Sequence, residues 1–262
     1  MAETMRSPLG ITFSVWRALL LREALSRISG GRVPWVWLLL EPVVHMAFMA
    51  FIFTSIGHRV IGGIDVVLWI IVGFSAFFTF RRSGTQGLNG INANRALFTY
   101  RQVRPVDTVL VRALLEGLIM LLITLIILSG TALLGKTVFP DNPLTVFAAF
   151  FGLWLLGLGY GLVFSVPNEL IPEFAQIFGF LQTPLYLISG IVVPIGALPH
   201  DYREWLLYNP ILHGVELARV GYANYYHGDS DLSLTYLYSC ALVMVFFGLA
   251  LQLRFVQRMI SK

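Results

Sequence analysis

Six long apolar blocks are the feature that most constrains the fold of this sequence of 262 residues. They cover approximately residues 34–56, 66–80, 108–134, 143–166, 174–195 and 232–255. A helix of about 20 apolar residues crosses a hydrocarbon core of about 30 Å. The chain is 57% hydrophobic and only 12% charged, which excludes an ordinary soluble domain. We therefore expect an all-α membrane protein with six transmembrane helices.

The segment before the first block, residues 1–33, has the pattern of an amphipathic helix. Val15, Trp16 and Leu19 share a helical stripe, whereas Arg17 and Arg27 fall largely on the other side. The repeated charges argue against a cleaved signal peptide. We expect a helix that lies in the cytoplasmic interface of the membrane.

The distribution of positive charge predicts the orientation of the blocks, because Lys and Arg accumulate on cytoplasmic loops. With six spans, 14 of the 18 cations fall on the side that holds both chain ends and the loop 81–107. We therefore expect cytoplasmic N- and C-termini. The segment 196–231 is then periplasmic.

Residues 196–231 are too polar to span a membrane but contain two short helical patterns, at 201–208 and 211–226. Proline and glycine separate these patterns from their surroundings. A re-entrant or interfacial helical hairpin between spans five and six is the structure that we expect. The aromatic residues of this hairpin are typical headgroup anchors, and some of them are candidates for an exit surface. The candidates are Tyr202, Trp205, Tyr208 and Tyr222.

The sequence contains none of the usual motifs of hydrolysis or phosphoryl transfer. There is no phosphate-binding loop, no HExxH and no GxSxG pattern. The single cysteine, Cys240, and five scattered histidines form no metal-ligand spacing. We expect no metal, no cofactor on this chain and no ATP hydrolysis by it. Transport, assembly and signalling remain as possible roles, and the basic loop 81–104 has the character of a docking surface for a soluble partner.

Three segments resemble those of a known family. The string LYLISGIVVPIGALPHDYREWLLYNPILHGVELAR (185–219) is similar to a region of ABC-2 type exporter permeases. The strings WVWLLLEPVV (35–44) and NANRALF (92–98) resemble the capsular polysaccharide export permeases of Gram-negative bacteria. The resemblance covers almost the whole chain and implies one ABC-2 transmembrane domain over residues 1–262, in the bacterial inner membrane.

The resemblance also implies partners. A homodimer of this chain would bind two copies of a separate ABC ATPase, which would hold ATP and Mg²⁺. A lipid-linked, acidic polysaccharide would pass outward toward a periplasmic co-polymerase, in contact with membrane lipid and with no nucleic acid. The N-terminal helix and the loop between spans two and three would contact the ATPase. The residues that we assign to this coupling are Arg95, Leu97, Phe98 and Arg101.

Candidates for the substrate path come from residue chemistry. Glu41 and His45 are ionisable groups inside the first span, where they are costly unless they face protein or water. Basic residues at the inner leaflet are either recognition groups or ordinary topology determinants. Aromatic residues form either a surface for sugar rings or an interfacial belt. The basic and aromatic candidates are Arg27, Arg32, Trp35, Trp37, Phe77 and Phe78.

Two further patterns predict packing. Glu116 follows Arg112 by one helical turn, and we expect these two side chains to pair. Gly157, Gly159 and Gly161 form a small-residue face that allows close helix contact.

Other functions remain open from the sequence. An O-antigen or teichoic-acid exporter would use a very similar permease. A membrane enzyme acting on lipid-linked sugars would need clustered acid, base or metal residues, which are not visible. An assembly factor would also be compatible with the docking loop.

Overall fold

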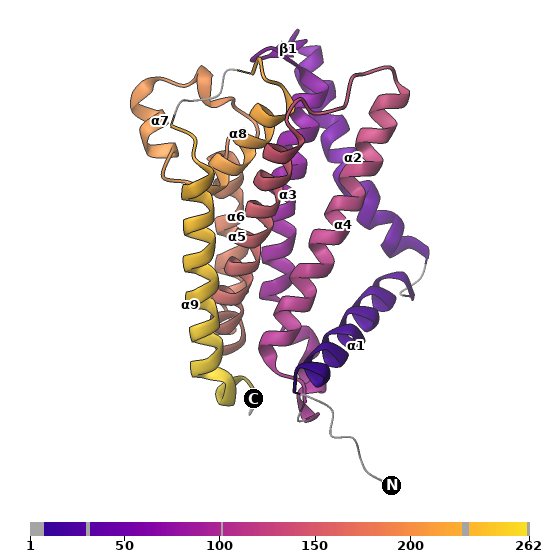
Figure 1. Cartoon of the computed structure of the whole chain (residues 1–262), viewed down its shortest axis with the longest axis vertical. Helices are drawn as coiled ribbons and strands as arrows, with labels where there is room; N and C mark the ends of the chain where they lie inside the picture. The colour runs from indigo at the N-terminus through magenta and orange to yellow at the C-terminus, as the bar shows by residue number, and fades with distance from the viewer. Residues whose placement is uncertain (1–7, 30–31, 101, 227–230, 261–262) are drawn as a thin grey trace.

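The computed structural model describes residues 8–29, 32–100, 102–226 and 231–260. Long helices run side by side along the long axis of the molecule (Figure 1). The elements are, in order, α1 (Pro8–Ser29), α2 (Arg32–Ser55), β1 (Val60–Ile61), β2 (Ile64–Asp65), α3 (Val66–Leu88), η1 (Asn92–Thr99), α4 (Pro105–Leu133), α5 (Pro143–Leu170), α6 (Phe174–Leu187), η2 (Ile195–Ala197), α7 (His200–Leu206), α8 (Pro210–Tyr222) and α9 (Leu234–Ile260). Apart from the short β1–β2 hairpin, the regular secondary structure of the described residues is helical.

Four of the described helices are long and apolar enough to cross a membrane, namely α3, α4, α5 and α9. Two of the six expected spans are shorter. The apolar part of α2 covers Leu39–Ser55. Helix α6 has 14 residues, which corresponds to about 21 Å. The all-α membrane class is therefore confirmed, whereas the fifth apolar block does not form one helix up to residue 195, because the chain turns after Leu187.

Helix α3 is longer than the sequence predicted. We expected the second span to end at Phe80, with a loop from Arg81, but α3 continues to Leu88. The physical reason is close packing against α5: the Cα of Gly161 lies 3.2 Å from where a Cβ on Gly87 would be. Arg81 and Arg82 therefore belong to a helix, and the expected loop is reduced to η1 and its flanking turns.

Helix α5 lies at the centre of the bundle and packs against α3, α8 and α9. A Cβ on Gly157 would lie 2.5 Å from the carbonyl oxygen of Phe80, and a Cβ on Gly159 would lie 2.8 Å from the Cβ of Met244. The expected close helix contact is therefore confirmed, on the α3 side and on the α9 side of α5.

Two helices, α7 and α8, occupy the segment that we expected to form a hairpin. Asn209 separates them and caps α8, because its side-chain oxygen accepts a hydrogen bond of 3.0 Å from the amide of Ile211. Helix α7 has no buried residues, whereas most of α8 is buried against α3 and α5. The second half of the hairpin is therefore part of the bundle and does not lie on its surface.

The segments that the sequence assigned to the ATPase contact and to the exit hairpin lie at opposite ends of the molecule (Figure 1). The start of α1 and the end of α9 lie at one end, and η1 joins them there because Phe98 and Met259 share a core cluster. The β1–β2 hairpin and α7 lie at the opposite end. The bundle therefore has one end that carries most of the arginines and one that carries the aromatic hairpin.

Candidate functional site

A buried carboxylate fastens α1 to the bundle. Glu116 on α4 is fully buried, and its two oxygens contact Arg27 of α1 and, at 3.3 Å, the Nε of Arg82 of α3. Two arginines on one carboxylate leave one net positive charge. An ion pair in a partly dry environment is strongly destabilised when one partner is removed. This cluster therefore fixes α1 to α3 and α4.

The expected Arg112–Glu116 pair does not form, although both residues are described. Arg112 instead donates from Nε to Glu23 of α1 at 3.1 Å and from a terminal nitrogen to the carbonyl of Asn89 at 3.2 Å. A neighbour one helical turn away stabilises by only about 0.2–0.5 kcal/mol. The prediction was wrong because tertiary partners gave each of the two charges a better geometry.

A second cluster joins α1 to η1 around Glu23. The side-chain amide of Asn94 donates to Glu23 at 3.0 Å, and Arg22 donates to the Asn94 oxygen. Burial by itself would raise the pKa of the Glu23 carboxyl, but the hydrogen bond and charge of Arg112 outweigh it, and Asn94 and Arg22 act in the same direction. The pKa of Glu23 is therefore lower than its ordinary value. The carboxylate stays charged and holds η1 in place.

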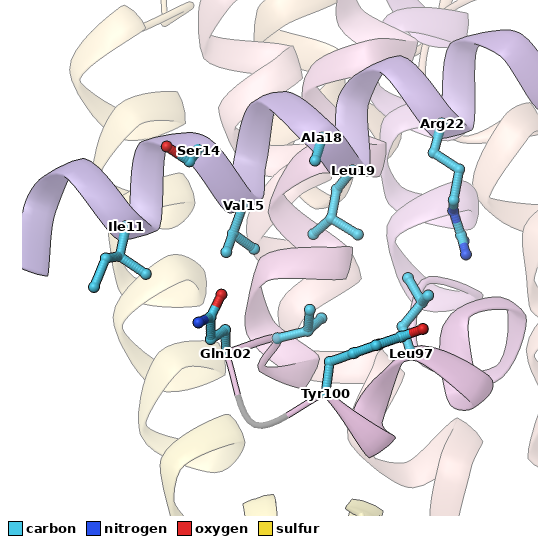
Figure 2. A pocket seen from close by; sticks show the side chains of 10 residues that line it. Ile11, Ser14, Val15, Ala18, Leu19, Arg22, Leu97, Tyr100 and Gln102 are labelled. Atoms are coloured by element: carbon cyan, nitrogen blue, oxygen red, sulfur yellow. The ribbon is translucent and has the colours of Figure 1, made fainter. Parts of the chain in front are cut away.

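A groove of about 440 Å³ lies between α1 and the end of η1 with the turn that follows it (Figure 2). Ile11, Val15 and Leu19 of α1 point into this groove, and Leu97, Tyr100 and Gln102 form its opposite wall. The lining is mainly apolar, with Ser14, Arg22 and Gln102 as its polar members. The structure thus brings α1 and the expected coupling segment to one surface.

The expected coupling residues have different surroundings. Leu97 lines the groove, but Phe98 is only 8% exposed and packs inside the chain against Ile91 and Val109. Arg95 is half exposed and pairs with the buried Glu169 of α5. Arg101 lies outside the described residues. Of these four side chains, Leu97 and Arg95 are therefore the ones placed where a partner could reach them.

Three candidates of the substrate path lie on one side of α2. Trp37, Glu41 and His45 follow one another at a spacing of four residues, and Trp37 is 61% exposed. The Nε2 of His45 lies 3.3 Å from the hydroxyl of Tyr186 on α6, and its ring packs 5.8 Å from that of Phe78. A cavity of about 170 Å³ lies next to them, between α2 and α3, and its lining residues are Glu41, Pro42, Phe78, Arg81, Arg82, Thr85 and Gln86.

Other path candidates are not at this surface. Phe77 is fully buried in the core. Arg27 is bound to Glu116, so its charge is largely compensated. Arg32 and Trp35 belong to α2, but their side chains lie outside the described part of the chain. The structure therefore brings together Glu41, His45 and Phe78, and it adds Arg81 and Tyr186.

The aromatic residues of the hairpin fall into two groups. Tyr202, Trp205 and Tyr208 are between 66% and 78% exposed. Tyr222 is buried, and its hydroxyl donates to the carbonyl of Val138. The first three are available to a ligand or to lipid, whereas Tyr222 holds α8 against the segment before α5.

A buried polar network that sequence reasoning missed connects α8 to α3. Arg219 is fully buried, stacks 3.6 Å above the ring of Trp69, and donates to the carbonyl of Gly190 at 2.6 Å. It also donates to Glu216 at 2.7 Å, and the hydroxyl of Tyr226 donates to the other Glu216 oxygen at 2.7 Å. An acid and a base three residues apart in an otherwise apolar segment were the available signal. This network positions α8.

Together, these features define a multi-pass α-helical membrane protein, with α1 held to the bundle by ion pairs at one end and α8 held by a buried polar network at the other. Comparison with known families agrees with this description. The ABC-2 type transporter family matches residues 14–223, and the chain belongs to this family.

Curated relatives cover nearly the whole chain. The polysialic acid transport protein KpsM of Escherichia coli is 36% identical over 234 residues, which is 89% of this chain and 90% of that protein. The capsule polysaccharide export inner-membrane protein CtrC of Neisseria meningitidis is 25% identical over 91% of this chain and 89% of its own length. BexB of Haemophilus influenzae, with the same description, is 26% identical over 84% of this chain and 83% of its own length.

Proposed function

We propose that this chain is the membrane permease subunit of an ATP-driven exporter that moves lipid-linked capsular polysaccharide across the bacterial inner membrane. The observation that carries the proposal is its 36% identity, over nine-tenths of both chains, to a polysialic acid transport protein. A likeness of this length leaves only about a tenth of either chain unmatched. ATP and Mg²⁺ bind to a separate ABC ATPase.

The functional unit is a homodimer with two ATPase subunits, and each chain has six spans with both termini in the cytoplasm. The charge distribution supports this topology, because 14 of 18 cations then fall on the cytoplasmic side. Exposed apolar side chains on α2 and α6, such as Phe51 and Phe180, support membrane burial or subunit contact for these two shorter helices. The exposed aromatics of α7 face the exit and a periplasmic co-polymerase.

The ATPase docks at the groove between α1 and η1. Leu97 and Tyr100 are the apolar contacts, and Arg95 lies at the edge of the same segment. Since the ion pairs of Glu23 and Glu116 connect this surface to α4, a push on η1 moves α1 and the bundle together. The polysaccharide passes along the side of α2 that carries Glu41 and His45.

A deletion strain tests the proposed function directly. Deletion of this gene should remove capsular polysaccharide from the cell surface, while lipid-linked polymer accumulates inside the cell. Expression of the intact chain should restore export. Surface polysaccharide at the native level in the deletion strain would refute the proposal. Chemical analysis of the retained polymer distinguishes capsule from O-antigen or teichoic acid, and copurification of an ATPase distinguishes a permease from an enzyme or an assembly factor.

A further inference from the structure

We propose that the cavity between α2 and α3 is a binding site for one oxyanion of an acidic sugar or of its phosphate link, with Arg81 as the residue that contacts the anion. The inference rests on the proposed function and makes it more specific, because it assigns selectivity for acidic polymers to a particular side chain. Its support comes from the charges and partners around the cavity.

The two arginines of the cavity differ in their partners. Arg82 is already held by Glu116, which it contacts at 3.3 Å. Arg81, one residue earlier, is exposed, lines the same cavity and has no carboxylate within ion-pair distance in the described ranges 8–29, 32–100, 102–226 and 231–260. One guanidinium therefore stabilises the wall of the cavity, whereas the other remains available to a ligand.

The charge balance of the region also favours an anion. Arg27, Arg81 and Arg82 carry three positive charges, and Glu41 and Glu116 carry two negative charges. One positive charge is left over, and a single bound oxyanion would neutralise it. A guanidinium presents a planar fork that binds carboxylate and phosphate oxygens in pairs, which makes an arginine more selective for these groups than a simple cation.

The other members of the cavity suit a sugar that carries this anion. The Glu41 carboxylate accepts hydrogen bonds from sugar hydroxyls, and it repels a second negative charge. Phe78 supplies an apolar wall. Arg81 and Phe78 line the same cavity, and the ring of His45 packs against Phe78, so Arg81 lies on the same side of the proposed path as His45. A volume of about 170 Å³ suits one ring-sized group and excludes a folded chain.

Binding to the purified full chain in phosphatidylcholine nanodiscs tests the inference. The probes are an oligomer of glucuronic acid, a glucose oligomer of equal length and glycerol phosphate, with affinity measured by calorimetry. We expect the native chain to bind at least one of the two anionic probes more tightly than the neutral oligomer. Which of the two binds shows whether a sugar carboxylate or a phosphate link is recognised. Arg81→Gln should weaken that binding by about 10- to 100-fold, because hydrogen bonds to a charged group are lost.

Two variants make the result specific. Arg81→Lys keeps the charge and should retain part of the affinity, which excludes misfolding as the cause of a loss. Arg17→Gln removes an exposed α1 arginine that does not line the cavity and should leave binding unchanged. Equal binding of acidic and neutral oligomers, no binding by the native chain, or an equal loss in Arg17→Gln would overturn the inference. If the deletion strain fails to export polymer but Arg81→Gln binds the anionic probes as tightly as the native chain, the proposed function stands and only this inference fails.

Discussion

Replacement of Glu116 by glutamine should release α1 from the bundle. The carboxylate is fully buried, and the side chains of its partners Arg27 and Arg82 are 17% and 16% exposed. Breaking a buried ion pair costs about 3–5 kcal/mol, because the remaining charge stays without compensation. Both arginines keep some contact with solvent, so we expect a loss of stability at the lower end of this range, about 3 kcal/mol. This corresponds to a change of about 100-fold in an equilibrium constant.

A double-mutant cycle measures the interaction between Glu116 and Arg27 separately from the other effects of each single substitution. The free energy of unfolding is obtained from SDS titration of the purified chain in mild detergent, for Glu116→Gln, for Arg27→Gln and for both together. We expect a coupling energy above about 1.5 kcal/mol, since the two side chains are in direct contact.

The matched control uses the partner that the local sequence suggested. A cycle between Glu116→Gln and Arg112→Gln should give a coupling energy below about 0.5 kcal/mol, the limit for exposed pairs one helical turn apart. If the Arg112 cycle gave the larger coupling, the tertiary assignment would be wrong and the local helical pair would be correct. A coupling near zero in both cycles would refute the role of Glu116 in holding α1.

Three other outcomes follow from the structure. Leu97→Ala should leave the abundance of the permease in the membrane unchanged but reduce copurification of the ATPase, because Leu97 lines the groove. Phe98→Ala should instead lower the abundance of the permease, since removing a buried Phe costs about 3–5 kcal/mol. The opposite pattern would place Phe98 at the partner surface. The pKa of Glu23 is lowered, so the stability that its carboxylate contributes is present at neutral pH and is lost as pH falls through the lowered pKa. Glu23→Gln should therefore be less stable than the native chain at pH 7, with a difference in the free energy of unfolding that shrinks on acidification, as followed by SDS titration. A difference that grows on acidification would contradict this sign. Gly157→Ala should separate α3 from α5 and lower thermal stability in detergent, because the new Cβ would lie 2.5 Å from a backbone oxygen. Gly130→Ala is the control and should be tolerated, since a Cβ there meets no atom within 4 Å. Equal thermal stability of the two variants would refute the close contact.

The hydrophobic pattern predicted the class of this protein and much of its layout. Blocks of about 20 apolar residues leave few structures other than transmembrane helices, because every backbone polar group in lipid must find its partner within the helix. The break at Asn209-Pro210 predicted where α8 begins, since a capping side chain and a proline at the first turn are local signals. The small-residue face of α5 was visible for the same reason, because it repeats along a single helix.

The boundaries of the second span were not predictable in this way. Arg81 to Leu88 looks polar, and the hydrophobic pattern ends at Phe80. The helix continues because Gly84 and Gly87 meet α5 at close distance, which is a property of two segments and not of one. The same limit applies to Phe98, which the family resemblance assigned to the contact with the ATPase but which is buried in a cluster with Ile91 and Val109 in the structure.

The sequence by itself therefore determined the membrane class, the N-terminal helix, the two short helices α7 and α8, and the family resemblance, all of which depend on the order of residues along one helix or loop. Only the tertiary structure decided which charges meet. Glu116 binds Arg27 and Arg82, and Arg112 binds Glu23, across separations of many residues. A buried charge takes the partner that compensates its lost hydration best, and helix packing, which no local pattern encodes, decides which partners lie within reach.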